Sequence, residues 1–167
     1  RDETVRYALG VAYEKAGARE AAVAAMQDLL ALNPDHADAL SFVGYSLAER
    51  GLRLDEAEKM VARALELRPG NGYFMDSLGW VYFQKGEFGR AVSMLEKADA
   101  VSGGEPTILE HLGDAYRRAG RPADAEKAWR RALRALKQGA EAERPTQQAA
   151  LERKIREVAP EIRPAKR

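Results

Sequence analysis

The chain has 167 residues, of which 46% are hydrophobic and 32% charged, and its formal net charge is +1. This length suits one domain that can bury a core, and no apolar run approaches the ~18 residues that a membrane span needs. The sequence contains no cysteine, which excludes disulfide bonds, thiolate metal sites and a cysteine nucleophile.

Charge is distributed unevenly along the chain. Residues 1–116 contain 12 Lys/Arg and 19 Asp/Glu, whereas residues 117–167 contain 15 and 7. This asymmetry is typical of a solvated basic end, of head-to-tail stacking or of a basic end offered to an acidic partner. Asp124 and Glu126 interrupt the basic residues of 117–134 and no nucleic-acid motif is present, so nucleic-acid binding is the least favoured function.

A repeat of about 34 residues organises most of the chain. Each copy has an apolar residue before a glycine, a second glycine seven residues later, and an alanine five or six residues after that. These positions are Gly10, Gly44, Gly79 and Gly113; Gly17, Gly51, Gly86 and Gly120; and Ala22, Ala57, Ala91 and Ala125. The copies are residues 3–36, 37–71, 72–105 and 106–139, together forming a repeat domain over 1–139. The second copy has one extra residue, which we place in a turn around Leu52–Asp55.

Each copy contains two windows with apolar residues at helical spacing. In the third copy, Tyr82 and Phe88 are predicted core residues, wedged between helices. Gly79 and Ala91 allow the two backbones to approach closely, and Gly86 can end the first helix with a positive φ. Because one copy cannot bury its apolar face alone, stacked copies build a continuous core.

Residues 140–167 follow the repeats. A polar connection leads to Thr146, a candidate cap for a helix at about 147–158. The apolar stripe of that helix consists of Leu151, Ile155 and Val158. Such a helix behind a repeat stack covers the last apolar face, with binding to a membrane surface as the alternative. We expect the basic tail, residues 160–167, to be loosely ordered.

The repeat resembles the tetratricopeptide repeat, a helix–turn–helix unit. The resemblance implies an all-α fold, a right-handed superhelix (α-solenoid) of four helix pairs with a C-terminal capping helix. The stretches "DSLGWVYFQKGEFGRAV" and "HLGDAYRRAGRPADAEKAWRRAL" are similar, within residues 40–136, to the C-terminal repeats of Gram-negative envelope and lipoprotein-type adaptors. This implies the periplasm or the inner face of the outer membrane, with the cytoplasm as the alternative. The start at Arg1, without an initiator Met or a signal-peptide pattern, indicates a fragment or a processed product.

The resemblance also implies that five positions of each first helix face a concave groove. Applied to this sequence, those positions give a candidate partner-binding surface. Its residues are Tyr7, Val11, Tyr45, Tyr73, Asp76, Trp80, Phe83, Glu110, Asp114 and Arg117. Aromatic side chains are favoured anchors at interfaces, and the acidic members favour a peptide or helix that carries Lys or Arg. The alternative for Trp80 and Phe83 is packing against neighbouring copies.

Patterns for catalysis are missing. His36 and His111 lie 75 positions apart without metal-ligand spacing, and we interpret His111 as a partly buried polar residue beside Glu110. The serines lack a G-x-S-x-G elbow, and "VSGGEPT" lacks the lysine of a phosphate loop. Tyr7 and Val11 stand where the family's carboxylate clamps have Lys and Asn, which argues against a chaperone co-factor of that kind.

The sequence therefore predicts a non-catalytic scaffold or adaptor, without cofactor or metal, that binds a partner peptide or helix in the groove. Self-assembly into a homo-oligomer is the alternative, because the first copy exposes an apolar face around Val5, Leu9 and Val23. A nucleic-acid-binding solenoid is less favoured.

Overall fold

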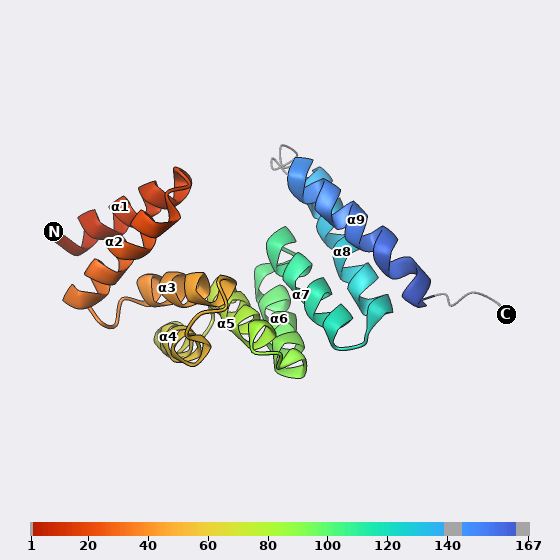
Figure 1. Cartoon of the computed structure of the whole chain (residues 1–167), viewed down its shortest axis with the longest axis horizontal. Helices are drawn as coiled ribbons and strands as arrows, with labels where there is room; N and C mark the ends of the chain where they lie inside the picture. The colour runs from red at the N-terminus through yellow and green to blue at the C-terminus, as the bar shows by residue number, and fades with distance from the viewer. Residues whose placement is uncertain (1, 139–144, 163–167) are drawn as a thin grey trace.

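The computed structural model describes residues 2–138 and 145–162. In these ranges the chain forms successive helix pairs that follow one another along the long axis (Figure 1). The first helices of the pairs are α1 (Asp2–Lys15), α3 (Ala37–Glu49), α5 (Gly72–Gln84) and α7 (Pro106–Arg118). The second helices are α2 (Arg19–Leu32), α4 (Leu54–Leu67), α6 (Phe88–Ser102) and α8 (Pro122–Gln138), and α9 (Pro145–Ile162) follows them. The predicted all-α solenoid of four helix pairs with a terminal helix is confirmed.

The turns inside the pairs are built on the second glycine of each copy. Gly17, Gly51, Gly86 and Gly120 have φ between +64° and +79°, a conformation that glycine adopts without steric cost. Three residues separate the helices in three of the pairs, but four separate α3 from α4. The last of these four, Arg53, has a φ of 47°. The extra residue of the second copy therefore lies in the predicted turn, where its backbone is left-handed.

Equivalent side chains begin three of the first helices. His36 Nδ1 accepts a hydrogen bond from the Ala39 amide at 3.3 Å. Asn71 Oδ1 accepts one from Phe74 at 3.1 Å, and Glu105 Oε2 accepts one from Ile108 at 2.9 Å. Each cap satisfies an amide that has no partner within its own helix. The junctions between copies are thus also the start points of α3, α5 and α7.

The first glycine of each copy lies where two helices nearly touch. A Cβ atom at Gly79 would stand 2.6 Å from Leu95 Cγ, and one at Gly44 would stand 2.5 Å from Val61 Cγ2. The four glycine–neighbour pairs are Gly10–Met26, Gly44–Val61, Gly79–Leu95 and Gly113–Trp129. We expected Ala91 to face Gly79; Ala91 is fully buried in the core, but Leu95, one turn further along α6, occupies that place.

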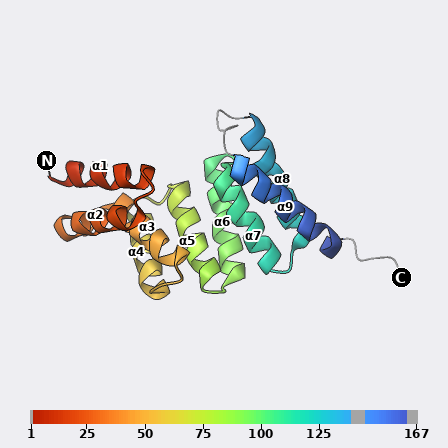
Figure 2. The ribbon, with the colours of Figure 1, turned by 45° about the horizontal axis from the view of Figure 1, so that its top comes forward.

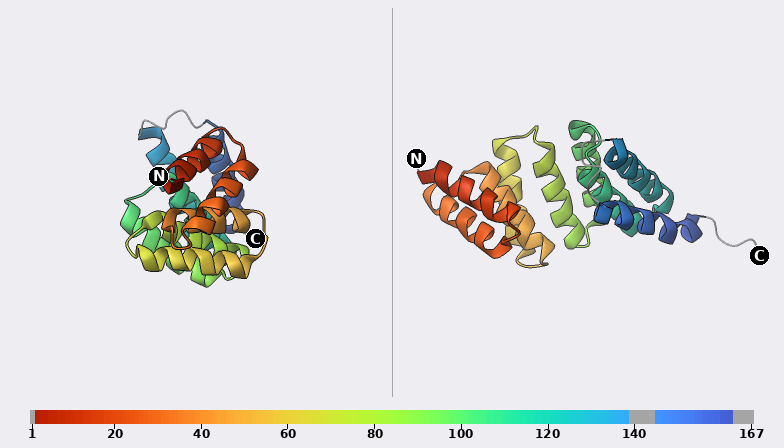
Figure 3. Two further views of the ribbon diagram at one scale, coloured as in Figure 1. Left: turned by 90° about the vertical axis from the view of Figure 1, so that its left-hand side faces the viewer. Right: turned by 90° about the horizontal axis from the view of Figure 1, so that it is seen from above.

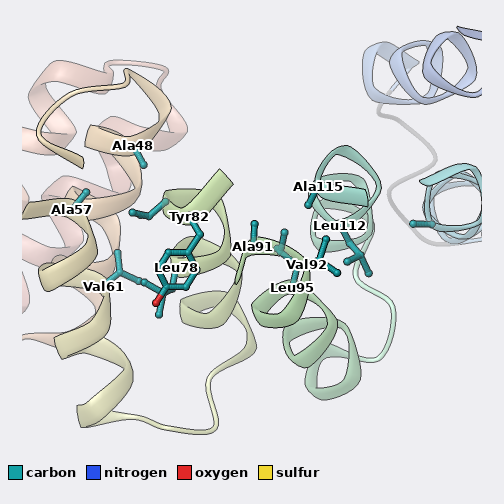
Figure 4. Close-up of a cluster of buried hydrophobic side chains, with 12 residues drawn as sticks. Ala48, Ala57, Val61, Leu78, Tyr82, Ala91, Val92, Leu95, Leu112 and Ala115 are labelled. Atoms are coloured by element: carbon teal, nitrogen blue, oxygen red, sulfur yellow. The ribbon is translucent and has the colours of Figure 1, made fainter. Parts of the chain in front are cut away.

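A continuous core links the copies. Its largest cluster extends from Ala48 on α3 through Tyr82 on α5 to Ala128 on α8 (Figure 4). Tyr82 is 8% exposed, as predicted for a core residue. Phe88 is only partly buried, so the prediction that it is a core residue is wrong. The exposed Arg118 guanidinium carbon lies 4.4 Å from the centroid of the Phe88 ring, so a surface side chain covers it.

The terminal helix α9 covers the last repeat (Figures 2 and 3). Leu151, Ile155 and Val158 are buried in a cluster with Trp129 and Leu136 of α8. The helix is longer than the predicted 147–158. The helix begins at Pro145. Proline has no backbone N–H, but the first helical position needs none, because an N–H there has no acceptor within the helix. Thr146, the predicted cap, therefore lies inside the helix. At its end, residues 160–162, which we expected in a loosely ordered tail, are helical, and Ile162 packs on the same cluster; the rest of that tail lies outside the described residues.

The opposite end of the stack exposes the apolar face predicted for the first copy. Val5 is 64% exposed and Leu9 is 45% exposed, whereas Val23 is partly buried. The residues that occupy the place of Val5 and Leu9 in the later copies are all at most 4% exposed. They are Ala39, Phe74, Ile108, Val43, Leu78 and Leu112. In those copies the face packs on the preceding helix pair.

The close approach at Gly79 gives a stability prediction. Gly79→Ala places a methyl group against Leu95, so we expect destabilisation by about 1–3 kcal/mol through overpacking. Gly89→Ala, on the neighbouring helix α6 with open space around the position, is the matched control and should be neutral or stabilising by up to about 1 kcal/mol. Urea denaturation followed by circular dichroism measures both. Equal midpoints for the two variants would contradict the steric argument.

Candidate protein-interaction site

A histidine and a tryptophan meet at the junction between the third and fourth copies. His111 of α7 is buried, and its Nδ1 lies 2.8 Å from Asp76 Oδ1 of α5. Burial lowers the pKa of His111, but the carboxylates of Asp76, Asp114 and Glu110 together outweigh burial, so the net pKa is raised. The imidazole also stacks on Trp80, with 4.2 Å between ring centroids. This side chain of α7 is therefore held by both a carboxylate and an aromatic ring of α5.

Two further rings extend this contact. Phe83 stacks on Trp80 at 4.6 Å, and Tyr45 of α3 lies 6.3 Å from His111. Burial and the Glu49 carboxylate, which accepts a hydrogen bond from the Tyr45 hydroxyl at 3.0 Å, raise the pKa of Tyr45. We call Tyr45, Trp80, Phe83 and His111 the aromatic cluster. It joins three successive first helices, and its members other than His111 keep part of their surface exposed.

The Trp80 indole is not fully satisfied within the chain. Its Nε1 is buried and has no hydrogen-bond partner among the described residues. Such unpaired donors are rare in folded proteins and cost free energy.

The same three positions meet at every junction between first helices. Two of these positions belong to one copy: one lies three residues before its first glycine and the other lies one residue after it. The third position lies two residues before the first glycine of the next copy. At the first junction, Tyr7, Val11 and Phe42 pack on one apolar cluster. At the second, where Tyr45 is the other member, Ser41 Oγ lies 3.2 Å from Ser77 Oγ. At the third junction, the three positions hold Asp76, Trp80 and His111. The polarity of the junctions therefore changes along the stack.

At the fourth junction α9 supplies the third residue. Lys154 Nζ lies 2.8 Å from Glu110 Oε1 and 2.8 Å from an Asp114 carboxylate oxygen. Burial lowers the pKa of Lys154, but Asp114 and Glu110 together outweigh it and raise that pKa. Gln147 also donates to Glu110, at 3.0 Å. Two carboxylates predicted to line an open groove are thus bound by the terminal helix.

The structure separates the predicted site residues into groups. Tyr45, Trp80 and Phe83 lie together in the aromatic cluster, next to Asp76. Tyr73 is 64% exposed and makes no ring contact with them in the described chain. The remaining residues pack at other junctions, and Arg117 pairs with Glu161 at 2.6 Å. They are Tyr7, Val11, Glu110, Asp114 and Arg117.

Sequence reasoning missed the third residue of each junction. The sequence pattern predicts His111 only as a partly buried polar residue and does not place Phe42 or Lys154 in the site. The repeat places His111, Ser77 and Phe42 at equivalent positions, so their shared place was readable from the sequence. The position of Lys154 was not, because the connection to α9 does not follow the repeat.

Neither a metal site nor a membrane-spanning helix is found in the part of the chain that the structure describes. Residues 2–138 and 145–162 contain no cluster of three or more His, Cys, Asp or Glu that could hold a metal ion. Within the same ranges, no helix has both the length and the apolar character that crossing a bilayer requires.

Comparisons with known proteins agree with this architecture. Residues 7–71 and 52–106 match one family model described as "Tetratricopeptide repeat", and residues 107–143 match a second with the same description. The TPR repeat-containing protein PA4667 of Pseudomonas aeruginosa is 36% identical over 70 residues, which are 42% of this chain and 12% of that protein. The matched segment is therefore a small part of this relative.

Solved structures show the fold. TTC0263, a thermophilic TPR protein of Thermus thermophilus, has a TM-score of 0.72 at 23% identity, over 95% of this chain and 92% of that one. Pseudomonas aeruginosa PilF has a TM-score of 0.68 at 20% identity, over 93% and 70%. At these identities the likeness establishes the solenoid and not the partner.

The ion pairs of Lys154 give a prediction about α9. Lys154→Met leaves two largely buried carboxylates without their cation, and we expect α9 to lose about 1–3 kcal/mol of stabilisation. Hydrogen exchange of residues 145–162 should become faster while that of α3 stays unchanged. Adding Glu110→Gln and Asp114→Asn should restore part of the protection. Unchanged exchange in Lys154→Met would show that apolar packing alone holds the helix.

Proposed function

Because the chain belongs to the tetratricopeptide repeat family, whose repeats typically mediate protein–protein interactions, we propose that its concave face binds a segment of a partner protein. Such repeats are usually non-catalytic, and the proposed role is that of an adaptor. The observation that carries the proposal is the aromatic cluster. Three first helices contribute rings to it, and three of its four members remain partly exposed.

The composition of the aromatic cluster fits an interface anchor. Trp and Tyr supply large contact areas with little loss of side-chain entropy, and they dominate the energetics of protein interfaces. The Trp80 ring is held in place between Phe83 and His111, so it would lose little freedom on binding. Either a helix or an extended segment is compatible with this surface.

Charge contributes less than the sequence suggested. Asp76, Glu110, Asp114 and Arg117 each have a partner within the chain, so they do not form a free charged rim. The basic second half is compensated in part, because Arg121, Arg130 and Arg131 pair with nearby carboxylates. A nucleic-acid role therefore gains no support. An envelope location, implied by resemblance, stays a proposal.

The groove proposal is tested on the aromatic cluster. Trp80→Ala with Phe83→Ala should weaken the capture of peptides selected on the parent protein, from a phage-displayed random library, by about tenfold or more. Fluorescence anisotropy with the selected peptides measures the change. Leu52→Ala, which removes an exposed apolar side chain from the α3–α4 turn, is the control and should bind as the parent does.

A second variant separates binding from folding. Trp80 and Phe83 pack against the core, whereas Tyr45 is outside the buried clusters, so Tyr45→Ala should keep the parent's circular dichroism and melting temperature. It should still weaken peptide binding. Unchanged affinity in both folded variants would remove the aromatic cluster from the interface.

Self-assembly is the second candidate, favoured by the exposed Val5 and Leu9. Their counterparts in later copies are buried, so two copies of the chain would gain free energy by covering this face. We expect concentration-dependent dimers in sedimentation velocity, and monomers after Val5→Lys with Leu9→Glu. A parent protein that stays monomeric at all concentrations would exclude this candidate.

A further inference from the structure

A cleft of about 180 Å³ lies between the first and second helix pairs. The end of α1, the α1–α2 turn, the start of α2 and the second half of α3 form its walls. The lining residues are Glu14, Gly17, Arg19, Ala22, Phe42, Tyr45, Ser46 and Glu49. Tyr45 belongs to the aromatic cluster as well, so the cleft continues the proposed binding surface toward the first copy.

The chain fills the equivalent place at each later junction with its own side chains. Between the second and third copies, Ala48, Leu54 and Val81 stand where Glu14, Arg19 and Ser46 stand here. Ala48 and Val81 belong to the main core cluster, and the partly buried Leu54 packs against it. The first junction has two charged side chains and a hydroxyl at these positions, where the next junction has three apolar side chains that pack in or on the core. The cleft is thus a specific departure from the repeat.

The two remaining junctions show which side chain this place accepts. Between the third and fourth copies, the Arg118 guanidinium lies 4.4 Å from the centroid of Phe88 and 5.9 Å from that of Phe83. Between the fourth copy and α9, Arg117 Nη2 lies 2.6 Å from Glu161 Oε1. In one case the guanidinium rests on aromatic rings, and in the other it meets a carboxylate.

The open cleft offers both features at once. Phe42 and Tyr45 supply aromatic rings, and Glu14 supplies a carboxylate that forms no ion pair or hydrogen bond with any residue the structure describes. Glu49 is already engaged, since it accepts the Tyr45 hydroxyl and pairs with Arg19 at 2.9 Å. The lining therefore carries one uncompensated negative charge.

We infer that this cleft receives an arginine side chain of the partner segment, with its guanidinium over the Phe42 and Tyr45 rings and paired with Glu14. The inference rests on the proposed function, because it assigns one anchor of the same partner. Arginine fits better than lysine, since its planar guanidinium stacks on rings and pairs with a carboxylate through two N–H groups.

A small probe tests the cleft without any partner. Titration of N-acetyl-arginine methylamide into the ¹⁵N-labelled protein should shift the amide signals of Gly17, Ala22 and Ser46 in a saturable manner. The norleucine analogue, which lacks the charge, should shift them much less. Glu14→Gln should weaken arginine binding about tenfold, whereas Glu20→Gln, an exposed control on α2, should not. No saturable shift, or equal binding by Glu14→Gln, would overturn the inference.

A filled variant provides a second, fold-preserving test. Glu14→Ala with Ser46→Val introduces the residues that the next junction carries at these positions, Ala48 and Val81. We expect an equal or higher melting temperature and no saturable shifts with the arginine probe. Parent-like arginine binding by this variant would overturn the inference.

The peptides selected for the groove separate the two proposals. They should be enriched in arginine and should lose about tenfold in affinity with Glu14→Gln. Peptides that depend on Trp80 but lack arginine, or that bind Glu14→Gln normally, would overturn this inference and leave the proposed groove intact. If the arginine probe binds in the cleft while no peptide depends on the aromatic cluster, the groove proposal fails and the cation site stands.

Discussion

The close contact between the two helices of each copy is the constraint on which the rest of the stack depends. A glycine on the first helix admits a side chain of the second to within contact distance of the backbone, and that side chain differs in every copy: Met26, Val61, Leu95 and Trp129. The repeated geometry then brings equivalent positions together at every junction, whatever residues occupy them.

That freedom allows each junction to have its own chemistry. The three positions that meet between first helices are apolar at the first junction, hydroxylic at the second, aromatic with a carboxylate–imidazole pair at the third and ionic at the fourth. Several members of these sets also pack against the core, as Trp80 does on the main cluster and Phe42 on the cluster around Met26. The fold thus keeps one backbone geometry while the side chains at its junctions vary.

The parts of this architecture that obey the repeat were predictable from sequence. The glycine turns, the buried Tyr82 and the turn that holds the extra residue all follow from local spacing. The parts that failed depend on where side chains distant in sequence come to lie. Lys154 meets Glu110 across 44 residues, and Phe88 is held at the surface beneath Arg118. Such contacts decide which of the predicted site residues stay free to bind a partner and which are already bound within the chain. No periodic pattern in the sequence encodes these contacts.

The turn at Arg53 shows how the stack treats a change in chain length. The contacting side chain lies sixteen positions after the glycine in three copies, but Val61 lies seventeen after Gly44. The added residue is absorbed before the second helix begins, so the contact is made with the correct side chain. One residue in a left-handed conformation costs on the order of 1 kcal/mol. At that small cost, the added residue leaves the contact between α3 and α4 in the same phase as in the other copies, and the later helices keep their regular spacing.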